Sequence, residues 1–155
     1  MALHLNQKAT QSLDSAIPPN VREFLESADT FQLLLEEEGR DFVAGDHKIK
    51  DETKLRTFEP TRIATIRSAK DKRAILEALY ADSATDESAA SCYEPHHGMR
   101  ATFHGRTVEI EICYDCAVFY VSGDMGKSTG TISRDHRKSE ATLNRLLHDL
   151  GVPIK

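Results

Sequence analysis

The sequence predicts a single α+β domain in which helices cover one face of an antiparallel sheet. Two short turns divide a segment of alternating apolar residues into a three-stranded meander, and apolar residues at helical spacing mark two main helices. We expect the strands over 99–103, 106–112 and 117–122. We expect the main helices over 69–82 and 136–150. At 155 residues the chain is long enough for one domain with a substantial core.

The N-terminal part is predicted from weaker signals. Residues 1–18 are polar with scattered leucines and no sustained apolar period, so we expect a mobile arm before a domain over 19–155. Asn20 is placed to cap a short helix over 21–28, whose apolar residues share one face. The run FQLLLEE, from Phe31, is interpreted as a strand because an acidic cluster ends it early.

A charged, irregular segment over 44–58 is typical of an exposed loop or a poorly packed hairpin. It is followed by TRIATIR at 61–67, which has the β-branched content of a strand. Ser68 and Asp71 then resemble a capping box at the start of the 69–82 helix. The apolar stripe of that helix is expected to cover the sheet.

The segment after the meander, GDMGKSTGT, contains a Gly-Lys-Ser sequence at 126–128 that matches the end of a phosphate-binding loop. The first glycine of such a loop would fall at position 121, which is Val, so the spacing argues against a nucleotide site. We expect a flexible surface loop instead. The last helix, over 136–150, is expected to end at Gly151 as a C-terminal cap.

The turns of the meander fix its registers. The first turn, at His104-Gly105, suits a two-residue hairpin because glycine tolerates positive φ. It predicts the pairs Phe103 with Arg106, Ala101 with Val108, Met99 with Ile110, and His97 with Ile112. The second turn, at Tyr114-Asp115, predicts Ile112 with Ala117, Ile110 with Phe119, and Val108 with Val121. In both registers the apolar side chains share one face of the sheet.

These registers gather potential metal ligands at one end of the sheet: Cys92, His96, His97, Cys113 and Cys116. Three thiolates and one imidazole would form a tetrahedral set of the kind that structural zinc prefers, and zinc is the one cofactor that these residues suggest. Two other interpretations stay open. The cysteines could pack the end of the sheet while the histidines hydrogen-bond to the backbone, or the C-x-x-C pair could carry thiol redox chemistry.

The same segment resembles a family of small bacterial proteins for which no activity is established. That family carries C-[FY]-x-P-R-H-G-[IL]-R, then G-[RK]-x-V-[DE], then I-C-[FY]-x-C. The matching residues here are Cys92, Tyr93, Pro95, His97, Gly98 and Arg100, then Gly105, Arg106, Val108 and Glu109, then Ile112, Cys113, Tyr114 and Cys116. His96 stands where the family has Arg, so the resemblance favours His97 as the site histidine. The match covers about a third of the chain and implies a fold but no mechanism.

Composition limits the classes of partner. A formal net charge of -5 argues against general nucleic-acid binding, which needs cationic side chains on the phosphates, and is compatible with a basic protein partner. The start, MALHLNQKATQS, lacks the features of a signal peptide, and no apolar run is long enough to span a membrane, so we expect a soluble protein. Three cysteines without an export signal predict a cytoplasmic location.

Three functions fit these observations. The favoured one is a non-enzymatic module that binds another protein, such as an intracellular inhibitor or immunity-type protein, because no nucleophile, base and orienting group are recognisable together. The second is a metal- or thiol-dependent enzyme, with Cys113 or Cys116 as the thiolate and His97 as base or ligand. The third is a zinc-stabilised binding domain.

Overall fold

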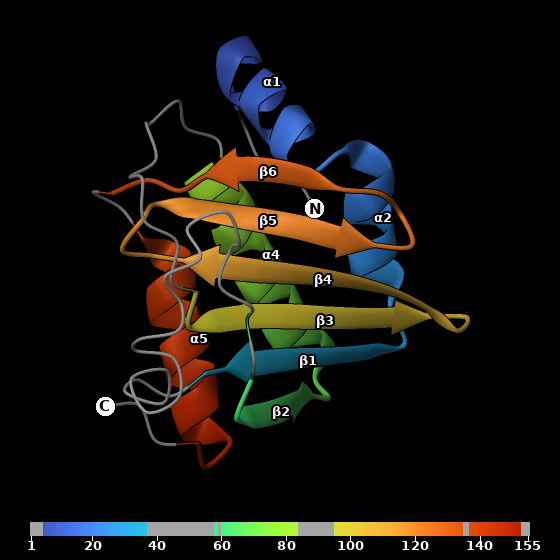
Figure 1. Cartoon of the computed structure of the whole chain (residues 1–155), viewed down its shortest axis with the longest axis vertical. Coiled ribbons are helices and arrows are strands. Elements are labelled where there is room, and N and C mark those ends of the chain that lie inside the picture. The colour runs from blue at the N-terminus through green and yellow to red at the C-terminus, as the bar shows by residue number, and fades with distance from the viewer. Residues whose placement is uncertain (1–4, 37–57, 59, 84–94, 135–136, 153–155) are drawn as a thin grey trace, which may run out of the picture.

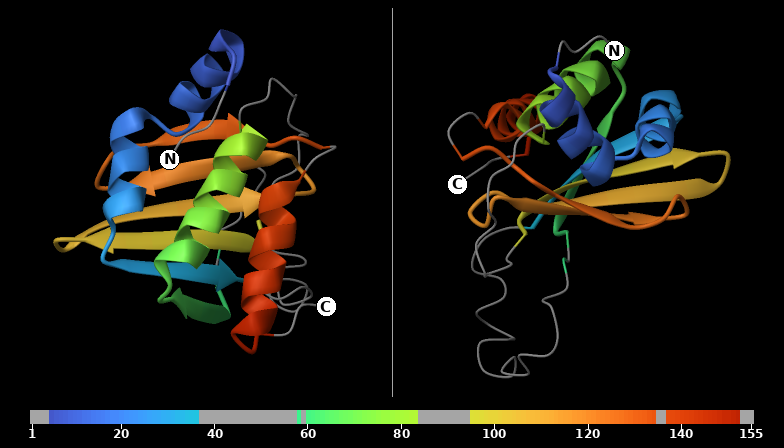
Figure 2. Two further views of the ribbon diagram at one scale, coloured as in Figure 1. Left: turned by 180° about the vertical axis from the view of Figure 1, so that it is seen from behind. Right: turned by 90° about the horizontal axis from the view of Figure 1, so that it is seen from above.

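A computed structural model describes residues 5–36, 58, 60–83, 95–134 and 137–152. Its six strands form one antiparallel sheet in the order β2-β1-β3-β4-β5-β6 (Figure 1). The strands are β1 (Thr30–Leu35), β2 (Arg62–Ile66), β3 (His97–Phe103), β4 (Arg106–Cys113), β5 (Val118–Gly123) and β6 (Ser128–Thr131). The helices are α1 (Gln7–Ala16), α2 (Pro19–Ser27), α4 (Ala69–Ser83) and α5 (Lys138–Asp149). All of these helices lie on the same face of the sheet, which confirms the predicted α+β fold (Figure 2).

The hairpin between β3 and β4 forms as predicted. His97 lies opposite Ile112, and the same register continues to the pair of Phe103 and Arg106 next to the turn. The two turn residues, His104 and Gly105, have φ angles of 50° and 77°. Positive φ at both positions is characteristic of a type I′ turn, whose twist matches that of the flanking strands.

The register between β4 and β5 differs from the prediction by two residues. Ile112 lies opposite Phe119 rather than Ala117, because a four-residue loop replaces the expected two-residue turn. Ala117 ends this loop with a φ of 57°, and its N–H donates to the carbonyl of Tyr114 at 3.2 Å. A two-residue loop would require positive φ at a tyrosine, whereas the longer loop requires it only at a small alanine. An even shift leaves the apolar residues on the same face.

The segment predicted as a flexible loop after β5 contains the edge strand β6. Gly130 pairs with Phe119 of β5, and Ser128 donates a hydrogen bond of 2.6 Å to the carbonyl of Ala16 at the end of α1. A Cβ at Gly130 would lie 2.4 Å from both Ala16 Cβ and Phe119 Cζ. Gly130 therefore allows close packing of α1 on the sheet. The sequence predicts a flexible loop at this glycine, whereas the structure shows that it is needed for packing.

The prediction of an N-terminal arm over residues 1–18 is wrong for most of that segment. Asn6 Oδ1 accepts from the N–H of Ala9 at 2.8 Å and caps α1. Leu13 and Ile17 on this segment are 5% and 0% exposed, and both belong to the main core. The buried apolar residues at the end of α1 cover little more than one helical turn, which is too short to predict a helix from periodicity.

The remaining elements agree with the sequence to within a few residues. Helix α2 begins at Pro19 rather than after Asn20, since proline is favoured in the first turn. The N–H of Asp71 donates to Ser68 Oγ at 3.3 Å, as expected for a cap of α4. After α5, Gly151 has a φ of 83° and the N–H of Val152 donates to the carbonyl of Leu147 at 2.8 Å. These features form a Schellman cap.

The predicted loop over 44–58 lies outside the described residues except for its last member, Phe58. That side chain is 8% exposed, so the expected exposure is wrong at this residue. A Cβ at Gly98 would lie 3.1 Å from Phe58 Cε1, so Phe58 packs on β3. No helix among the described ranges is long and apolar enough to cross a membrane.

We predict that Gly130→Ala lowers the free energy of unfolding by about 1–3 kcal/mol, because the added methyl group would collide with Ala16 and Phe119. Urea denaturation measures this loss. Thr129→Ala, on the exposed side of the same strand, is the control and should change stability little. Equal stabilities of the Gly130→Ala chain and the parent would contradict the close packing of α1 on β6.

Candidate functional site

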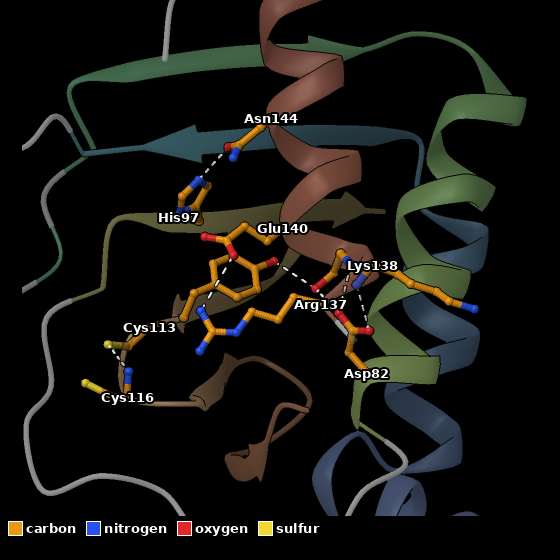
Figure 3. Close-up of polar contacts among 10 residues, drawn as sticks. Asp82, His97, Cys113, Cys116, Arg137, Lys138, Glu140 and Asn144 are labelled. Atoms are coloured by element: carbon orange, nitrogen blue, oxygen red, sulfur yellow. Dashed lines mark hydrogen bonds and ion pairs between the residues drawn. The ribbon is translucent and has the colours of Figure 1, made fainter. Parts of the chain in front are cut away.

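A buried carboxylate joins the ends of two helices. Asp82, near the end of α4, is 2% exposed. Its oxygens accept from the N–H of Lys138 at 3.0 Å and from the N–H and hydroxyl of Ser139 at 2.7 and 2.6 Å (Figure 3). The residue before α5, Arg137, makes no side-chain capping bond. Asp82 therefore caps α5 from the neighbouring helix, where a carboxylate interacts favourably with the positive end of the helix dipole.

Tyr114 extends this polar chain to the sheet. Its hydroxyl lies 2.8 Å from Ser139 Oγ. Since the Ser139 hydroxyl donates its hydrogen to Asp82, Tyr114 must donate to Ser139. Burial raises the pKa of Tyr114 well above its ordinary value, so the phenol keeps the proton that this bond requires. The loop between β4 and β5 is thus tied to the first turn of α5.

His97 lies beside this chain on the same face of the sheet. Its Nε2 is 2.9 Å from Oδ1 of Asn144 on α5, and its ring meets that of Tyr114 edge to face with centroids 5.2 Å apart. Burial lowers the pKa of His97, although the hydrogen bond to Asn144 opposes the shift. The imidazole is therefore neutral at pH 7 and donates from Nε2.

The two C-x-x-C thiols lie on the other face. Cys113 and Cys116 are 1% and 0% exposed, and they form a small cluster with Val118. The N–H of Cys116 donates to Sγ of Cys113 at 3.2 Å (Figure 3). Because successive residues of a strand point to opposite faces, Ile112 faces the helices with its partner His97, and Cys113 faces away.

The five predicted metal ligands are thus only partly brought together. Cys113 and Cys116 are in contact, whereas His97 belongs to the opposite face. His96 Nδ1 lies 3.3 Å from the carbonyl oxygen of Glu36. Cys92 lies outside the described residues. Within the described part of the chain, no three or more His, Cys, Asp or Glu side chains are grouped to hold a metal ion.

Sequence reasoning missed Asp82 and Ser139, although a signal for both was present. The buried stripe of α4 runs through Leu76 and Leu79, and the next position at the same spacing is Asp82 or Ser83. In α5, Ser139 precedes Leu143 and Leu146 on the buried face. Polar residues at apolar positions of two helices indicate a buried polar contact between them.

These buried groups are poorly placed for chemistry on a substrate. Asp82 and Ser139 are 2% and 0% exposed, and both oxygens of the carboxylate accept hydrogen bonds from α5. The imidazole of His97 contacts Asn144 and the Tyr114 ring instead of the serine hydroxyl. The arrangement positions a helix on a sheet.

A shallow hollow lined by Glu26, Ala69, Lys72 and Arg73 lies where α2 meets the start of α4. The ammonium group of Lys72 donates to the carbonyls of Glu26 and Ala28 at 2.8 and 3.2 Å. A cation at the last carbonyls of a helix satisfies those acceptors and stabilises the negative end of the dipole. We interpret Lys72 as a cap of α2.

The outer edge of β2 is a second candidate site, at the surface. β2 pairs with β1 on one side, and no strand of the described residues pairs with its other side. Ile63, in this strand, is 49% exposed, and among the described residues the only other exposed large hydrophobic side chain is Leu150, at 47%. Ile63 lies opposite Leu34, which is 1% exposed. The edge thus combines an outer side that no described strand covers with an apolar side chain.

Comparison with known proteins finds no match: no family model, no curated protein and no solved structure resembles the chain closely enough to be recognised.

We predict that Asp82→Ala and Ser139→Ala each lower the free energy of unfolding by about 2 kcal/mol, because each leaves buried polar partners unsatisfied. The double variant should lose less than the sum, with a coupling energy of about 1 kcal/mol or more. Denaturation of the four chains of this cycle measures the coupling. Asp149→Ala, whose side chain is 57% exposed, is the control and should have little effect. Strict additivity would contradict a direct contact.

We predict that His97 makes stability depend on pH. Because burial lowers the pKa of His97 below the ordinary 6.5, the unfolded chain binds a proton more readily, and this contribution to stability is lost as the pH falls below about 6.5. His97→Gln should therefore flatten the decline in the free energy of unfolding between neutral and acidic pH. His148→Gln, whose side chain is 82% exposed, should leave the decline unchanged. Identical pH profiles for the parent and His97→Gln would contradict the burial of a neutral imidazole.

Proposed function

We propose that this chain is a non-enzymatic protein-interaction module that binds an extended segment of another protein along the outer edge of β2. The observation that carries the proposal is the coincidence of an unpaired strand edge, within the described residues, with the half-exposed side chain of Ile63. Natural sheets protect long apolar edges because an edge strand is a template for pairing with another chain. An edge left with an exposed β-branched residue is suited to that pairing.

An added strand would gain two kinds of contact. Outward-facing N–H and C=O groups of β2, on the side that no described strand covers, would hydrogen-bond to the backbone of the partner, which gives affinity without requiring a particular sequence. Ile63 would contact the side chain directly opposite it on the added strand and the diagonal neighbours on the same face, and it would favour apolar residues at these alternate positions. The partner is therefore a protein with an extended segment that alternates apolar and polar residues.

The buried positions of the thiols favour this function over a thiol enzyme. Cys113 and Cys116 are nearly inaccessible, and His97 lies on the other face of the sheet, so thiolate and base do not meet. The zinc-stabilised binding domain keeps the same binding function and adds a metal that would need Cys92. The narrower assignment, a cytoplasmic inhibitor or immunity-type protein, is supported by the acidic net charge of -5, which suits a basic protein partner.

Ile63→Lys tests this proposal, because a lysine on an edge strand opposes the addition of another strand. Immobilised parent and variant chains would be exposed to a lysate of the native cells, and the retained proteins quantified by mass spectrometry. We predict that at least one protein is retained by the parent and about tenfold less by Ile63→Lys, a loss that corresponds to about 1.4 kcal/mol. Leu150→Lys is the matched control, since Leu150 is similarly exposed at 47% and lies after α5. It should retain the same protein as the parent.

Hydrogen exchange then tests the mode of binding. When the retained protein is added to the parent chain, amides of β2 should exchange more slowly while those of α1 are unchanged. Equal capture by the parent and Ile63→Lys, or protection confined to the helices, would contradict binding at the β2 edge.

A further inference from the structure

The loop between β4 and β5 places one cysteine on each side of a tyrosine and an aspartate. Cys113 is the last residue of β4, and Cys116 lies within the four-residue loop that Ala117 closes. The N–H of Cys116 donates to Sγ of Cys113 at 3.2 Å, and neither cysteine belongs to a disulfide. Cys113 therefore lies against the backbone of the residue that could become its disulfide partner.

This geometry brings the two sulfur atoms within reach of each other. The sulfur of Cys116 is three covalent bonds from the nitrogen that Cys113 Sγ contacts, so rotation of one side chain can direct it to Cys113. Both residues belong to the same small cluster with Val118. The N–H donor is also placed to stabilise negative charge on Cys113 Sγ, which is the charge that a sulfur atom carries when it attacks a disulfide.

We propose that Cys113 and Cys116 form a redox-active dithiol pair that a low-molecular-weight disulfide oxidises to an intrachain disulfide. Cys113 loses its proton to solvent, and its thiolate attacks one sulfur of the small disulfide and releases the first small thiolate, which takes up a proton. Cys116 then loses its proton to solvent and attacks Cys113 Sγ, which releases the second small thiolate, and that thiolate takes up a proton. Two protein thiols and one small disulfide become one protein disulfide and two small thiols.

The same loop connects the thiol pair to the opposite face of the sheet. Tyr114, between the cysteines, donates to Ser139 at the start of α5, while the thiols lie on the other face. Closure of the disulfide constrains the backbone on both sides of Tyr114. The Tyr114 hydroxyl stays 2.8 Å from Ser139 Oγ only if that backbone keeps its position. Oxidation of the thiols therefore changes the stability of the first turn of α5.

Burial of the thiols determines how the reaction proceeds. Exposures of 1% and 0% mean that the small disulfide reaches Cys113 only when the loop opens, so oxidation of the native chain is slow. The equilibrium is set by the free energies of the reduced and oxidised chains and does not depend on this access. The test must therefore approach equilibrium from both directions.

The experiment uses the full chain with Cys92→Ser, which leaves only the proposed pair of thiols. The reduced chain, and the same chain refolded in oxidised glutathione, would be incubated in glutathione buffers that range from fully reduced to fully oxidised. Free thiols are then alkylated under denaturing conditions and counted by mass spectrometry. We expect both preparations to converge on one two-electron transition. The oxidised chain should take up no alkyl group, whereas the reduced chain takes up two, and the disulfide should lie in the peptide that contains Cys113 and Cys116.

Two variants serve as controls. Cys113→Ser in the same background should show only a mixed disulfide of Cys116 with glutathione, which separates an intrachain bond from simple thiol modification. Tyr114→Phe should keep the redox transition but remove the difference in hydrogen exchange at the start of α5 between reduced and oxidised chains. Persistence of two free thiols in fully oxidised buffer, from both starting preparations, would overturn the proposal. An unchanged exchange at α5 on oxidation would overturn the coupling through Tyr114.

Disulfide formation between Cys113 and Cys116 does not depend on binding at the β2 edge. The redox transition is measured without a partner, and Ile63→Lys should leave it unchanged. Loss of one property without the other therefore identifies which of the two proposals fails.

Discussion

The buried carboxylate of Asp82 is the interaction on which the arrangement of the helices depends. A charged group that is 2% exposed is tolerated only when its oxygens are satisfied, and here the N–H groups at the start of α5 satisfy them. The requirement is mutual, because those N–H groups have no partner inside their own helix. The end of α4 is consequently fixed to the start of α5 on the sheet, and Ser139 extends the connection to Tyr114 in the β4–β5 loop.

That loop gives the two faces of the sheet different properties. Tyr114 faces α5 and takes part in its anchoring, whereas Cys113 and Cys116 lie on the face away from the helices. The helix-covered face holds the main core, while the candidate binding site lies at the outer edge of β2, beyond β1 and β3 from this loop. The proposed redox chemistry at the loop and the proposed binding at the edge are therefore separable, although both sites belong to one sheet.

The sequence predicts those parts of the fold that local chemistry determines. The type I′ turn at His104 and Gly105 and the apolar alternation of β3 and β4 fix a register that the structure confirms. The β4–β5 register could not be predicted from the sequence. It depends on the positive φ of Ala117, which is determined by the conformation of the whole loop. α1 and β6 could not be predicted either, since the reason for Gly130 is a contact with Ala16, more than a hundred residues earlier. Likewise, the grouping of Cys113 with Cys116 follows from sequence spacing, whereas Asp82 becomes interpretable only when α4 and α5 meet.

Hydrogen exchange of the amides of Lys138 and Ser139 tests the central claim most directly. Amides in the first turn of a helix normally exchange fast because they lack an intrahelical acceptor. If Asp82 accepts from both, at 3.0 and 2.7 Å, they should exchange as slowly as the interior amides of α5, with a free energy of opening close to that of global unfolding. Exchange of these two amides at the rate of an exposed helix terminus would contradict the claim that the buried carboxylate holds α5 in place.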